Sequence, residues 1–274
     1  PLTVLLIAVV LGLVGANVAN YATEGRQKRF IKGAFSQYLS PAVIEELMAD
    51  PERLRLGGER RDLSIFFSDI QGFTSISETL SPEELTALLN EYLSAMTDII
   101  QEEGGTIDKY EGDAIIAFWN APVGQEDHGA RSVRAALRCQ EQLAEMRPLF
   151  RARTRKDLFM RIGLNSGPAV VGNMGSKTRF DYTMLGDAVN LAARLEGVNK
   201  QFGTYTMVSE ATRAAAGEEF GYRELSKILV VGKNEPVTVY EPLRPSEQEL
   251  RSRELQLFDA ALHLFYQGSF REAR

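Results

Sequence analysis

The sequence has little of what covalent cross-links and transition-metal centres need. It contains one cysteine, Cys139, and two histidines among 274 residues. These shortages exclude a disulfide scaffold of the secreted kind and a zinc enzyme of the usual His/Cys kind. An excess of basic residues is also missing, because the formal net charge is -6. A general nucleic-acid binder would need a basic footprint, so we expect no nucleic-acid partner.

The rest of the composition is that of a folded protein. Hydrophobic residues make up 44% and charged residues 25% of the chain, which excludes wholesale disorder and a collagen-like chain. The length allows one good-sized core with flanking segments. Because 37 residues are acidic, we expect any divalent cation to be held by carboxylates, which suits Mg²⁺ or Mn²⁺.

A long apolar run is present only at the N-terminus. Residues 2–19 carry no charged side chain, and about 18 apolar residues is the lower limit for a membrane-spanning helix. Four basic residues follow the run within residues 26–32, whereas a signal peptide would carry them before it. We therefore expect a transmembrane helix over residues 1–22 with the following chain in the cytoplasm. The alternative is a buried core helix or hairpin.

Two further segments flank the middle of the chain. Helical spacing of apolar residues in 23–58 predicts a juxtamembrane coupling segment that pairs two chains, and a passive linker is the alternative. Residues 244–274 have a helical pattern, and their end resembles the first helix and turn of a tetratricopeptide repeat. An ordinary amphipathic helix is the alternative there. Because residue 1 is proline and not methionine, we also expect this sequence to come from a longer protein.

The middle segment, residues 59–243, alternates between strand and helix patterns. Apolar runs predict strands over 63–69, 106–110, 114–120, 160–166, 169–174, 205–208, 223–231 and 237–241. Helical periodicity predicts helices over 82–103, 126–146 and 187–199, with a further helix over 247–266. This interspersed order predicts an α+β fold with one sheet covered by helices.

Two acidic residues stand at the ends of predicted strands. Asp69 ends a hydrophobic strand and precedes a glycine-containing turn, and Asp113 lies on a hairpin turn before another apolar strand. Carboxylates at the ends of neighbouring strands could hold two divalent cations, and backbone amides after Asp69 could bind phosphate oxygens. A strand-end aspartate by itself is usually a turn or cap residue, so the surrounding motifs decide the interpretation.

Four motifs occur in a recognisable order. They are Phe-Ser-Asp69-Ile-Gln-Gly-Phe-Thr, Lys109-Tyr-Glu-Gly-Asp113, Arg161-Ile-Gly-Leu-Asn-Ser-Gly and Leu185-Gly-Asp-Ala-Val-Asn190-Leu-Ala-Ala-Arg194. Together they resemble the catalytic domain of class III nucleotidyl cyclases, which convert a nucleoside triphosphate into a 3′,5′-cyclic nucleotide and pyrophosphate. The resemblance covers residues 59–243. It implies a ferredoxin-like βαββαβ core.

The resemblance also implies a role for each matching residue. Asp69, Asp113 and the main chain of Ile70 would hold two divalent metal ions, Mg²⁺ or Mn²⁺. The triphosphate would be bound by Arg161 and by the main-chain amides of Ile70, Gln71, Gly72, Phe73 and Thr74. Asn190 and Arg194 lie four residues apart, on one face of a helix, and would orient the ribose and stabilise charge on the α-phosphate. Lys233 would match a phosphate-binding lysine, with a solvated hairpin lysine as the alternative.

Lys109 and Thr183 match the two positions that read the base in this family. Adenine offers an acceptor at N1 and a donor at N6, and guanine reverses both. A lysine ammonium can only donate, and a threonine hydroxyl can accept, so the implied substrate is ATP. The alternatives are a guanylyl or relaxed purine cyclase and an inactive nucleotide-binding domain. With threonine at position 183, the sequence also resembles a bacterial subgroup of the family that includes bicarbonate-responsive enzymes. This resemblance implies bicarbonate as a candidate regulator.

The family further implies an assembly. Its active site forms between two catalytic domains, one supplying the metal aspartates and the other Lys109, Thr183, Asn190 and Arg194. We therefore expect a head-to-tail homodimer, in keeping with the two-fold symmetry of most homo-oligomers. Residues 38–59 resemble bacterial membrane cyclases with a CHASE2-type sensor, which implies the cell inner membrane as the location and a cytoplasmic catalytic domain.

Overall fold

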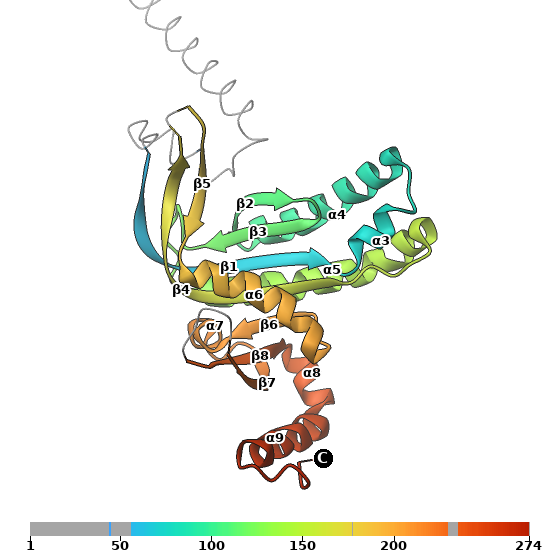
Figure 1. Cartoon of the computed structure of the whole chain (residues 1–274), viewed down its shortest axis with the longest axis vertical. Coiled ribbons are helices and arrows are strands. Elements are labelled where there is room, and N and C mark those ends of the chain that lie inside the picture. Colours follow the sequence, from blue (N-terminus) through green and yellow to red (C-terminus); the bar gives the residue numbers. More distant parts are fainter. Residues whose placement is uncertain (1–43, 45–55, 177, 230–234, 274) are drawn as a thin grey trace, which may run out of the picture. The chain divides into compact units, whose positions relative to one another are not determined.

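The computed structural model describes residue 44 and residues 56–176, 178–229 and 235–273 (Figure 1). Apart from residue 44, all of these residues belong to one compact unit, which begins at Leu54. The expected transmembrane helix and nearly all of the coupling segment lie outside the described residues, as does Lys233. Within the described part of the chain, no helix has the length and apolar character needed to cross a membrane.

This compact unit is built on a βαββαβ core. Its elements are β1 (Gly57–Ile70), α4 (Pro82–Glu102), β2 (Thr106–Glu111), β3 (Ala114–Trp119), α5 (His128–Thr154) and β4 (Met160–Gly175). The strands lie in the order β2-β3-β1-β4, with antiparallel neighbours throughout. This is the element order of a ferredoxin-like fold, as the family resemblance implied.

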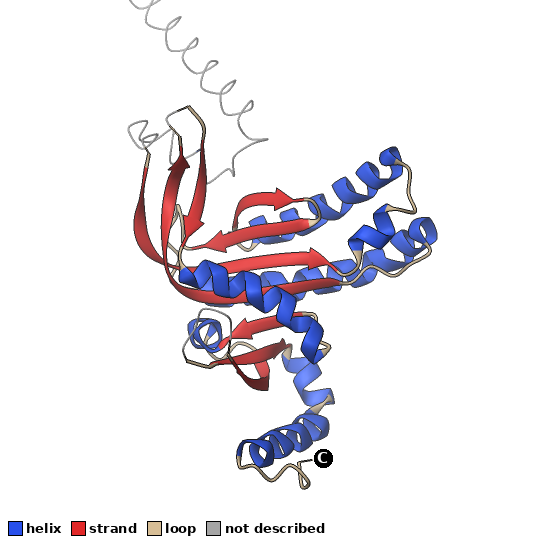
Figure 2. Cartoon of the chain, in the orientation of Figure 1, coloured by secondary structure: helices blue, strands red, loops and turns tan. Residues whose placement is uncertain are grey.

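Strand β1 contributes apolar residues to cores on both faces of the sheet, and helices lie against each face there (Figure 2). Phe66 of β1 belongs to the core formed with α4 and α5, whereas Leu63 and Ile65 belong to a core on the other face. Successive side chains of a strand point to opposite faces, so one strand can feed both cores. The second core includes Ala192 of α6 (Asp187–Phe202), which crosses β1 and β4.

Further strands extend the sheet beyond β4. The remaining elements are α3 (Phe73–Ser77), β5 (Phe180–Leu185), β6 (Thr206–Ser209), α7 (Glu210–Ala216), β7 (Gly221–Ile228), β8 (Val237–Leu243), α8 (Pro245–Leu250) and α9 (Ser252–Tyr266). The full order is β2-β3-β1-β4-β6-β8-β7, and β5 pairs with the far part of β4. β6 runs parallel to β4, so the sheet is mixed.

Local sequence explains where α4 begins. Ser81 accepts a hydrogen bond from the backbone of Glu84, the Glu84 side chain accepts one from the backbone of Ser81, and Pro82 occupies the first turn. This capping box satisfies two backbone groups that the helix cannot pair internally. The predicted helix over 82–103 is therefore confirmed almost to the residue.

Several predicted boundaries were wrong. β4 is one continuous strand, although Gly167-Pro168 predicted a break. β4 pairs with β6 over residues 162–164 and with β5 over residues 170–175. Pro168 lies between these stretches, where β1 is the strand paired with β4. A proline has no N–H to donate, and no described strand lies on the other side of β4 at this point to need that hydrogen bond.

Other differences concern short or polar elements. β5 and α7 were not predicted, α5 continues past Pro148 to Thr154, and the single C-terminal helix is split into α8 and α9 at Arg251. β7 covers Gly221–Ile228, and residues 230 and 231 of the predicted strand lie outside the described residues. β5, which reads Phe-Asp-Tyr-Thr-Met-Leu, alternates apolar and polar residues over its first five positions, so the sequence does contain a strand signal that the prediction missed.

Candidate active site

The two predicted metal ligands lie next to each other. Asp69 is the penultimate residue of β1, and Asp113 occupies the turn between β2 and β3. β3 is the neighbour of β1, with Ile115 opposite Ser68, so the turn lies beside the end of β1. The backbone N–H of Ile70 donates a 2.8 Å hydrogen bond to Asp113 Oδ2. The structure thus brings the two carboxylates together.

The electrostatics of this pair suit a cation. Burial raises the pKa of Asp113 to about 6, the hydrogen bond from Ile70 opposes that rise, and the nearby carboxylate of Asp69 adds to it. Two close carboxylates are therefore costly to ionise unless a positive charge lies between them.

The number of carboxylates also agrees with the predicted metal. Mg²⁺ is commonly held by one or two protein carboxylates together with substrate phosphates and waters. Among the described residues, no group of three or more His, Cys, Asp or Glu side chains is arranged to hold a metal ion. Asp69 and Asp113 fit divalent cations whose remaining ligands come from a bound triphosphate. The predicted contribution of the Ile70 main chain stays a prediction.

Arg161 lies between the aspartates and helix α6. It faces Asp69 across the β1–β4 ladder, and its Nη2 atom is 3.4 Å from Asp69 Oδ2. Its Nε atom donates a 2.9 Å hydrogen bond to Glu196 Oε1. Burial raises the pKa of Glu196, and the charge of Arg161 opposes that rise. Glu196 was not predicted, because its partner is 35 residues away in sequence.

The turn after Asp69 differs in detail from the prediction. The N–H of Ile70 is bonded to Asp113, and the N–H of Gln71 donates to the carbonyl of Phe159 at 2.8 Å. These two amides are therefore not available to phosphate in this structure. Gly72 adopts φ 71°, a left-handed conformation that favours glycine, and it caps α3. Gly72, Phe73 and Thr74 remain the candidate phosphate-binding amides.

Asn190 and Arg194 occupy the first half of α6. Asn190 is exposed, and Arg194 is half-buried. Within the described chain, the Nη1 atom of Arg194 is buried and lacks a hydrogen-bond acceptor. Buried polar atoms nearly always have a partner, so this donor is suited to an acceptor that the chain itself does not supply. A phosphate oxygen is an acceptor of that kind.

The two predicted base-reading residues meet at a residue that was not predicted. Thr183 of β5 donates a 2.8 Å hydrogen bond from Oγ1 to Asp108 Oδ2, and Lys109 Nζ of β2 lies 3.7 Å from Asp108 Oδ1. The site residues therefore form one group around Asp69 and another around Asp108. No hydrogen bond or ion pair among the described residues joins Asp69, Asp113 or Arg161 to Lys109 or Thr183.

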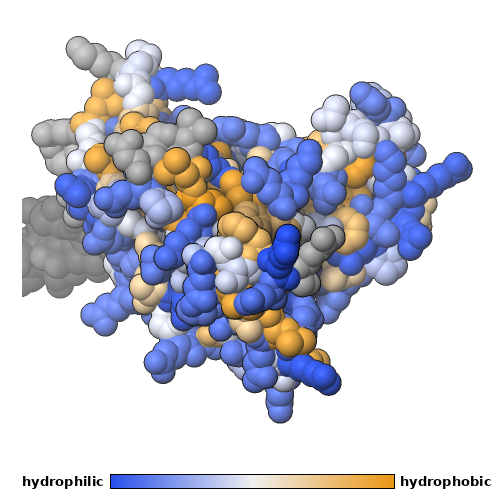
Figure 3. Space-filling model, turned by 60° about the horizontal axis from the view of Figure 1, so that its bottom comes forward, coloured by the Kyte–Doolittle hydropathy of each residue, from blue (hydrophilic) through white to orange (hydrophobic). Residues whose placement is uncertain are grey.

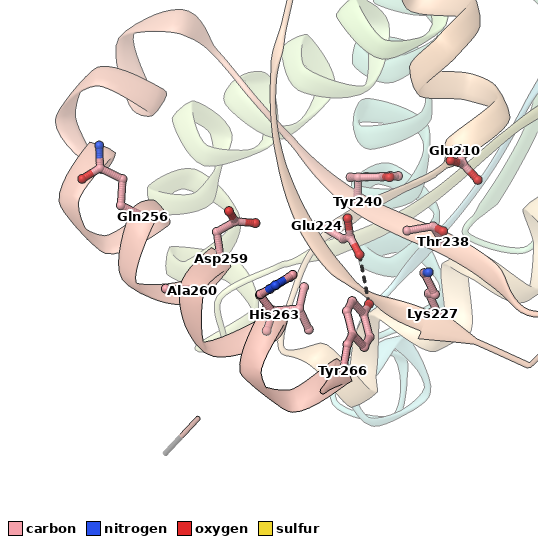
Figure 4. A pocket seen from close by; sticks show the side chains of 11 residues that line it. Glu210, Glu224, Lys227, Thr238, Tyr240, Gln256, Asp259, Ala260, His263 and Tyr266 are labelled. Carbon is pink, nitrogen blue, oxygen red and sulfur yellow. Dashed lines mark hydrogen bonds between the residues drawn. The ribbon is translucent and has the colours of Figure 1, made fainter. Parts of the chain in front are cut away.

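A separate cavity of about 620 Å³ lies between α9 and strands β7 and β8 (Figure 4). Its walls carry charges of both signs, including Glu224, Asp259 and Lys227, and Tyr266 donates a 3.0 Å hydrogen bond to Glu224. The face in Figure 3 is mostly hydrophilic, with scattered apolar patches. None of the residues of the four motifs lines this cavity. It is not the candidate active site.

The family assignment follows from comparison with known proteins. The family described as adenylate and guanylate cyclase catalytic domain matches residues 58–241. This chain belongs to that family. The expectation of a cyclase catalytic domain is therefore confirmed.

Two curated relatives of this cyclase chain are named adenylate cyclases. It is 38% identical over 182 residues to Adenylate cyclase 1 of Rhizobium meliloti (strain 1021), covering 66% of this chain and 27% of that protein. It is 35% identical over 221 residues to an adenylate cyclase of Anabaena cylindrica, covering 78% of this chain and 42% of that protein. The chain thus spans less than half the length of these relatives.

Solved structures of both substrate classes resemble this cyclase domain. The adenylyl cyclase CyaB from P. aeruginosa is 36% identical with a TM-score of 0.64, and the match covers 69% of this chain and 96% of that chain. The guanylyl cyclase Cya2 is 37% identical with a TM-score of 0.62, covering 68% and 94% respectively. Because the two identities are nearly equal, similarity does not choose between ATP and GTP.

Proposed function

We propose that this protein is an adenylyl cyclase that converts ATP into 3′,5′-cyclic AMP and pyrophosphate. The observation that carries the choice of ATP is the pairing of Lys109 and Thr183 around Asp108. The ammonium of Lys109 can only donate, so it complements N1 of adenine and opposes the N1–H of guanine. The hydroxyl of Thr183 can accept from the adenine amino group. A guanylyl cyclase is the second candidate, supported by the 37% identity to Cya2.

The chemistry requires charge to be controlled on the triphosphate. When bound at Asp69 and Asp113, divalent cations supply charge neutralisation and lower the pKa of the ribose 3′-hydroxyl. The ribose 3′-hydroxyl would lose its proton to water as its oxygen forms a bond to the α-phosphorus, and the bond from that phosphorus to the β-phosphate oxygen would break, which releases pyrophosphate. Arg161 would exchange its pairing with Asp69 for a triphosphate oxygen.

Two residues of α6 would act on the other side of the reacting centre. Asn190 would orient the ribose, and Arg194 would stabilise the charge that develops on the α-phosphate. The buried, unpaired Nη1 atom of Arg194 supports this role, since a preorganised donor needs no rearrangement when charge develops.

We propose that the complete site forms in a head-to-tail homodimer. The absence of a hydrogen bond or ion pair between the Asp69 group and the Lys109–Thr183 pair within the described chain supports this arrangement. One copy would supply the aspartates, and the other would supply Lys109, Thr183, Asn190 and Arg194. Anchoring to the cell inner membrane through residues 1–22, phosphate binding by Lys233 and regulation by bicarbonate remain predictions.

Cyclic-nucleotide production by the purified protein tests the proposal. ATP and GTP are each supplied with Mg²⁺ or Mn²⁺, and products are separated chromatographically. We expect cyclic AMP from ATP and a higher kcat/KM for ATP than for GTP. A preference for GTP would make the protein a guanylyl cyclase, and binding without product under all four conditions would make it a nucleotide-binding domain.

A further inference from the structure

Asp108 occupies an irregular position in β2. The β2–β3 register passes from Ile107 opposite Ala117 directly to Lys109 opposite Ile116, so Asp108 is the extra residue of a β-bulge. A bulge locally re-aims side chains that would otherwise alternate strictly between the two faces. Here it allows the adjacent side chains of Asp108 and Lys109 to approach each other, at 3.7 Å between Asp108 Oδ1 and Lys109 Nζ.

The Asp108 side chain is almost fully enclosed, with 4% of its surface exposed. Burial raises its pKa, and the hydrogen bond from Thr183 and the charge of Lys109 oppose that rise. Its Oδ2 atom accepts from Thr183, and its Oδ1 atom has no hydrogen bond among the described residues. Burying a carboxylate costs free energy unless it is paired. Thr183 and Lys109 supply the pairing for Asp108.

The hydrogen bond gives Thr183 a fixed polarity. A hydroxyl has one proton and two lone pairs and normally rotates to donate or accept as its partner demands. Because the Thr183 proton is committed to Asp108 Oδ2, the hydroxyl can offer only lone pairs to another molecule. Such a group accepts from the 6-amino group of adenine and has nothing to donate to the 6-carbonyl of guanine.

We propose that Asp108 is a positioning residue for base selection, which makes Thr183 an acceptor-only group and holds the Lys109 ammonium beside it. This inference rests on the proposed function and adds to it a residue that does not itself touch the base. Removing the charge of Asp108 should therefore change which purine is preferred, and not only how fast the enzyme works.

The test variant is Asp108→Asn, which nearly preserves side-chain volume. The Lys109 ammonium can only donate, so the amide oxygen of the new residue should face it and the amide N–H should face Thr183. That N–H would donate to Thr183 Oγ1, and the Thr183 proton would be free to donate to the guanine carbonyl. We expect the ATP/GTP ratio of kcat/KM to fall by about tenfold.

The matched control is Asp181→Asn. Asp181 lies on β5, is exposed, and acts on Asp108 through its charge. The Asp181→Asn variant therefore removes one negative charge near Asp108 and leaves the hydrogen bond between Thr183 and Asp108 in place. We expect this control to leave the ATP/GTP ratio within about twofold of the unmodified protein, since exposed charges are strongly screened.

A double-variant experiment separates the two neighbours of Asp108. Thr183→Val deletes the hydroxyl, so adding Asp108→Asn to it should cause little further change in the ratio. If Asp108→Asn lowers the ATP/GTP ratio as much in the Thr183→Val protein as in the unmodified protein, Asp108 does not act through Thr183. An unchanged ratio in folded Asp108→Asn would overturn the proposal altogether. If Asp108→Asn does not fold, Asp108→Ala also frees the Thr183 proton, although it removes the partner of Lys109 as well, and an unchanged ratio in that variant would likewise overturn the proposal.

Binding measurements keep this inference distinguishable from the proposed cyclase activity. Affinities for 3′-deoxy-ATP and 3′-deoxy-GTP, which lack the attacking hydroxyl, are measured by calorimetry on the same variants. A protein that makes no cyclic nucleotide but whose binding preference falls about tenfold in Asp108→Asn would refute the activity and support the role of Asp108. If the protein makes cyclic nucleotide but Asp108→Asn changes neither the binding preference nor the kcat/KM ratio, the activity would be supported and the role of Asp108 refuted.

Discussion

The backbone N–H of Ile70 donates a 2.8 Å hydrogen bond to the carboxylate of Asp113, 43 residues further along the chain. This bond ties the end of β1 to the turn between β2 and β3. It consequently holds Asp113 beside Asp69, the residue just before Ile70. Two carboxylates that would repel each other in water are thus held together by the backbone of the sheet, which is the arrangement that a cation site requires.

Replacing either carboxylate should remove activity without unfolding the protein. Asp69→Ala and Asp113→Ala each delete a ligand to the cations that neutralise the triphosphate, at a cost of several kcal/mol in transition-state stabilisation. We expect a loss in kcat/KM of at least about a hundredfold. Asp98→Ala, at an exposed position of α4, is the control. Near-normal turnover by either folded variant would exclude the metal assignment.

Inactive variants should complement each other if the site is shared between two copies. Asp69→Ala and Arg194→Ala are each expected to be nearly inactive alone. When they are mixed, a heterodimer keeps one intact site, so activity should return as the two proteins exchange subunits. Activity is measured against the mixing ratio, and heterodimers are detected with two affinity tags. Confirmed heterodimers without activity would mean that each site lies within one chain.

Reversing the charge at the base-reading position should change specificity. In Lys109→Glu, a carboxylate faces N1 of adenine, where a donor is required, and it can accept from the N1–H and the 2-amino group of guanine. Because mismatched buried groups cost about 1–3 kcal/mol each, the ATP/GTP ratio of kcat/KM should fall by about tenfold or more. Lys200→Glu, an exposed lysine on α6, controls for net charge. Equal losses with both nucleotides would indicate a structural role for Lys109.

The seating of α6 on the sheet can be tested with two glycines. A Cβ at Gly163 of β4 would collide with the backbone of Glu196 and Ala192, whereas one at Gly197 of α6 would meet no atom within 4 Å. Gly163→Ala should therefore destabilise the domain by about 1–3 kcal/mol and lower kcat, since α6 carries Asn190 and Arg194. Gly197→Ala should stabilise it by about 0.5–1 kcal/mol. Urea denaturation measures both, and similar effects would contradict the packing described.

Stability should depend on the protonation of His128. Its ring Nδ1 lies 2.8 Å from Ser64 Oγ, and burial lowers its pKa although Asp62 and Asp127 act in the opposite direction. As the pH falls, His128 is therefore protonated at a higher pH in the unfolded chain than in the folded chain. The free energy of unfolding that His128 contributes should be present above the ordinary histidine pKa of about 6.5 and be lost as the pH falls below it.

His128→Asn keeps a polar group near Ser64 and cannot titrate. The difference in unfolding free energy between this variant and the unmodified protein isolates the contribution of His128 from those of other groups. We expect that difference to change between about pH 7.5 and 5.5, in the direction that favours the unmodified protein at the higher pH. A difference that stays constant over this range would show that His128 titrates alike in both states.

The sequence by itself determined the elements with strong local signals and the order of the motifs. Periodic apolar residues and the cap at Ser81 were sufficient for α4, and apolar runs were sufficient for β3. The four motifs indicated the cyclase family that the comparison confirmed. These features depend on residues close to one another along the chain, so local patterns contain the necessary information.

Only the tertiary structure decided which residues surround the site. The sequence of β5 alternates apolar and polar residues, but only the fold decides that its backbone partner is the far part of β4. Glu196 and Asp108 acquire their partners across 35 and 75 residues of sequence. Such contacts follow from strand order, a β-bulge and the position of α6. A side chain whose partner comes from a distant element leaves no local pattern, because its environment is created by the folding of the whole sheet.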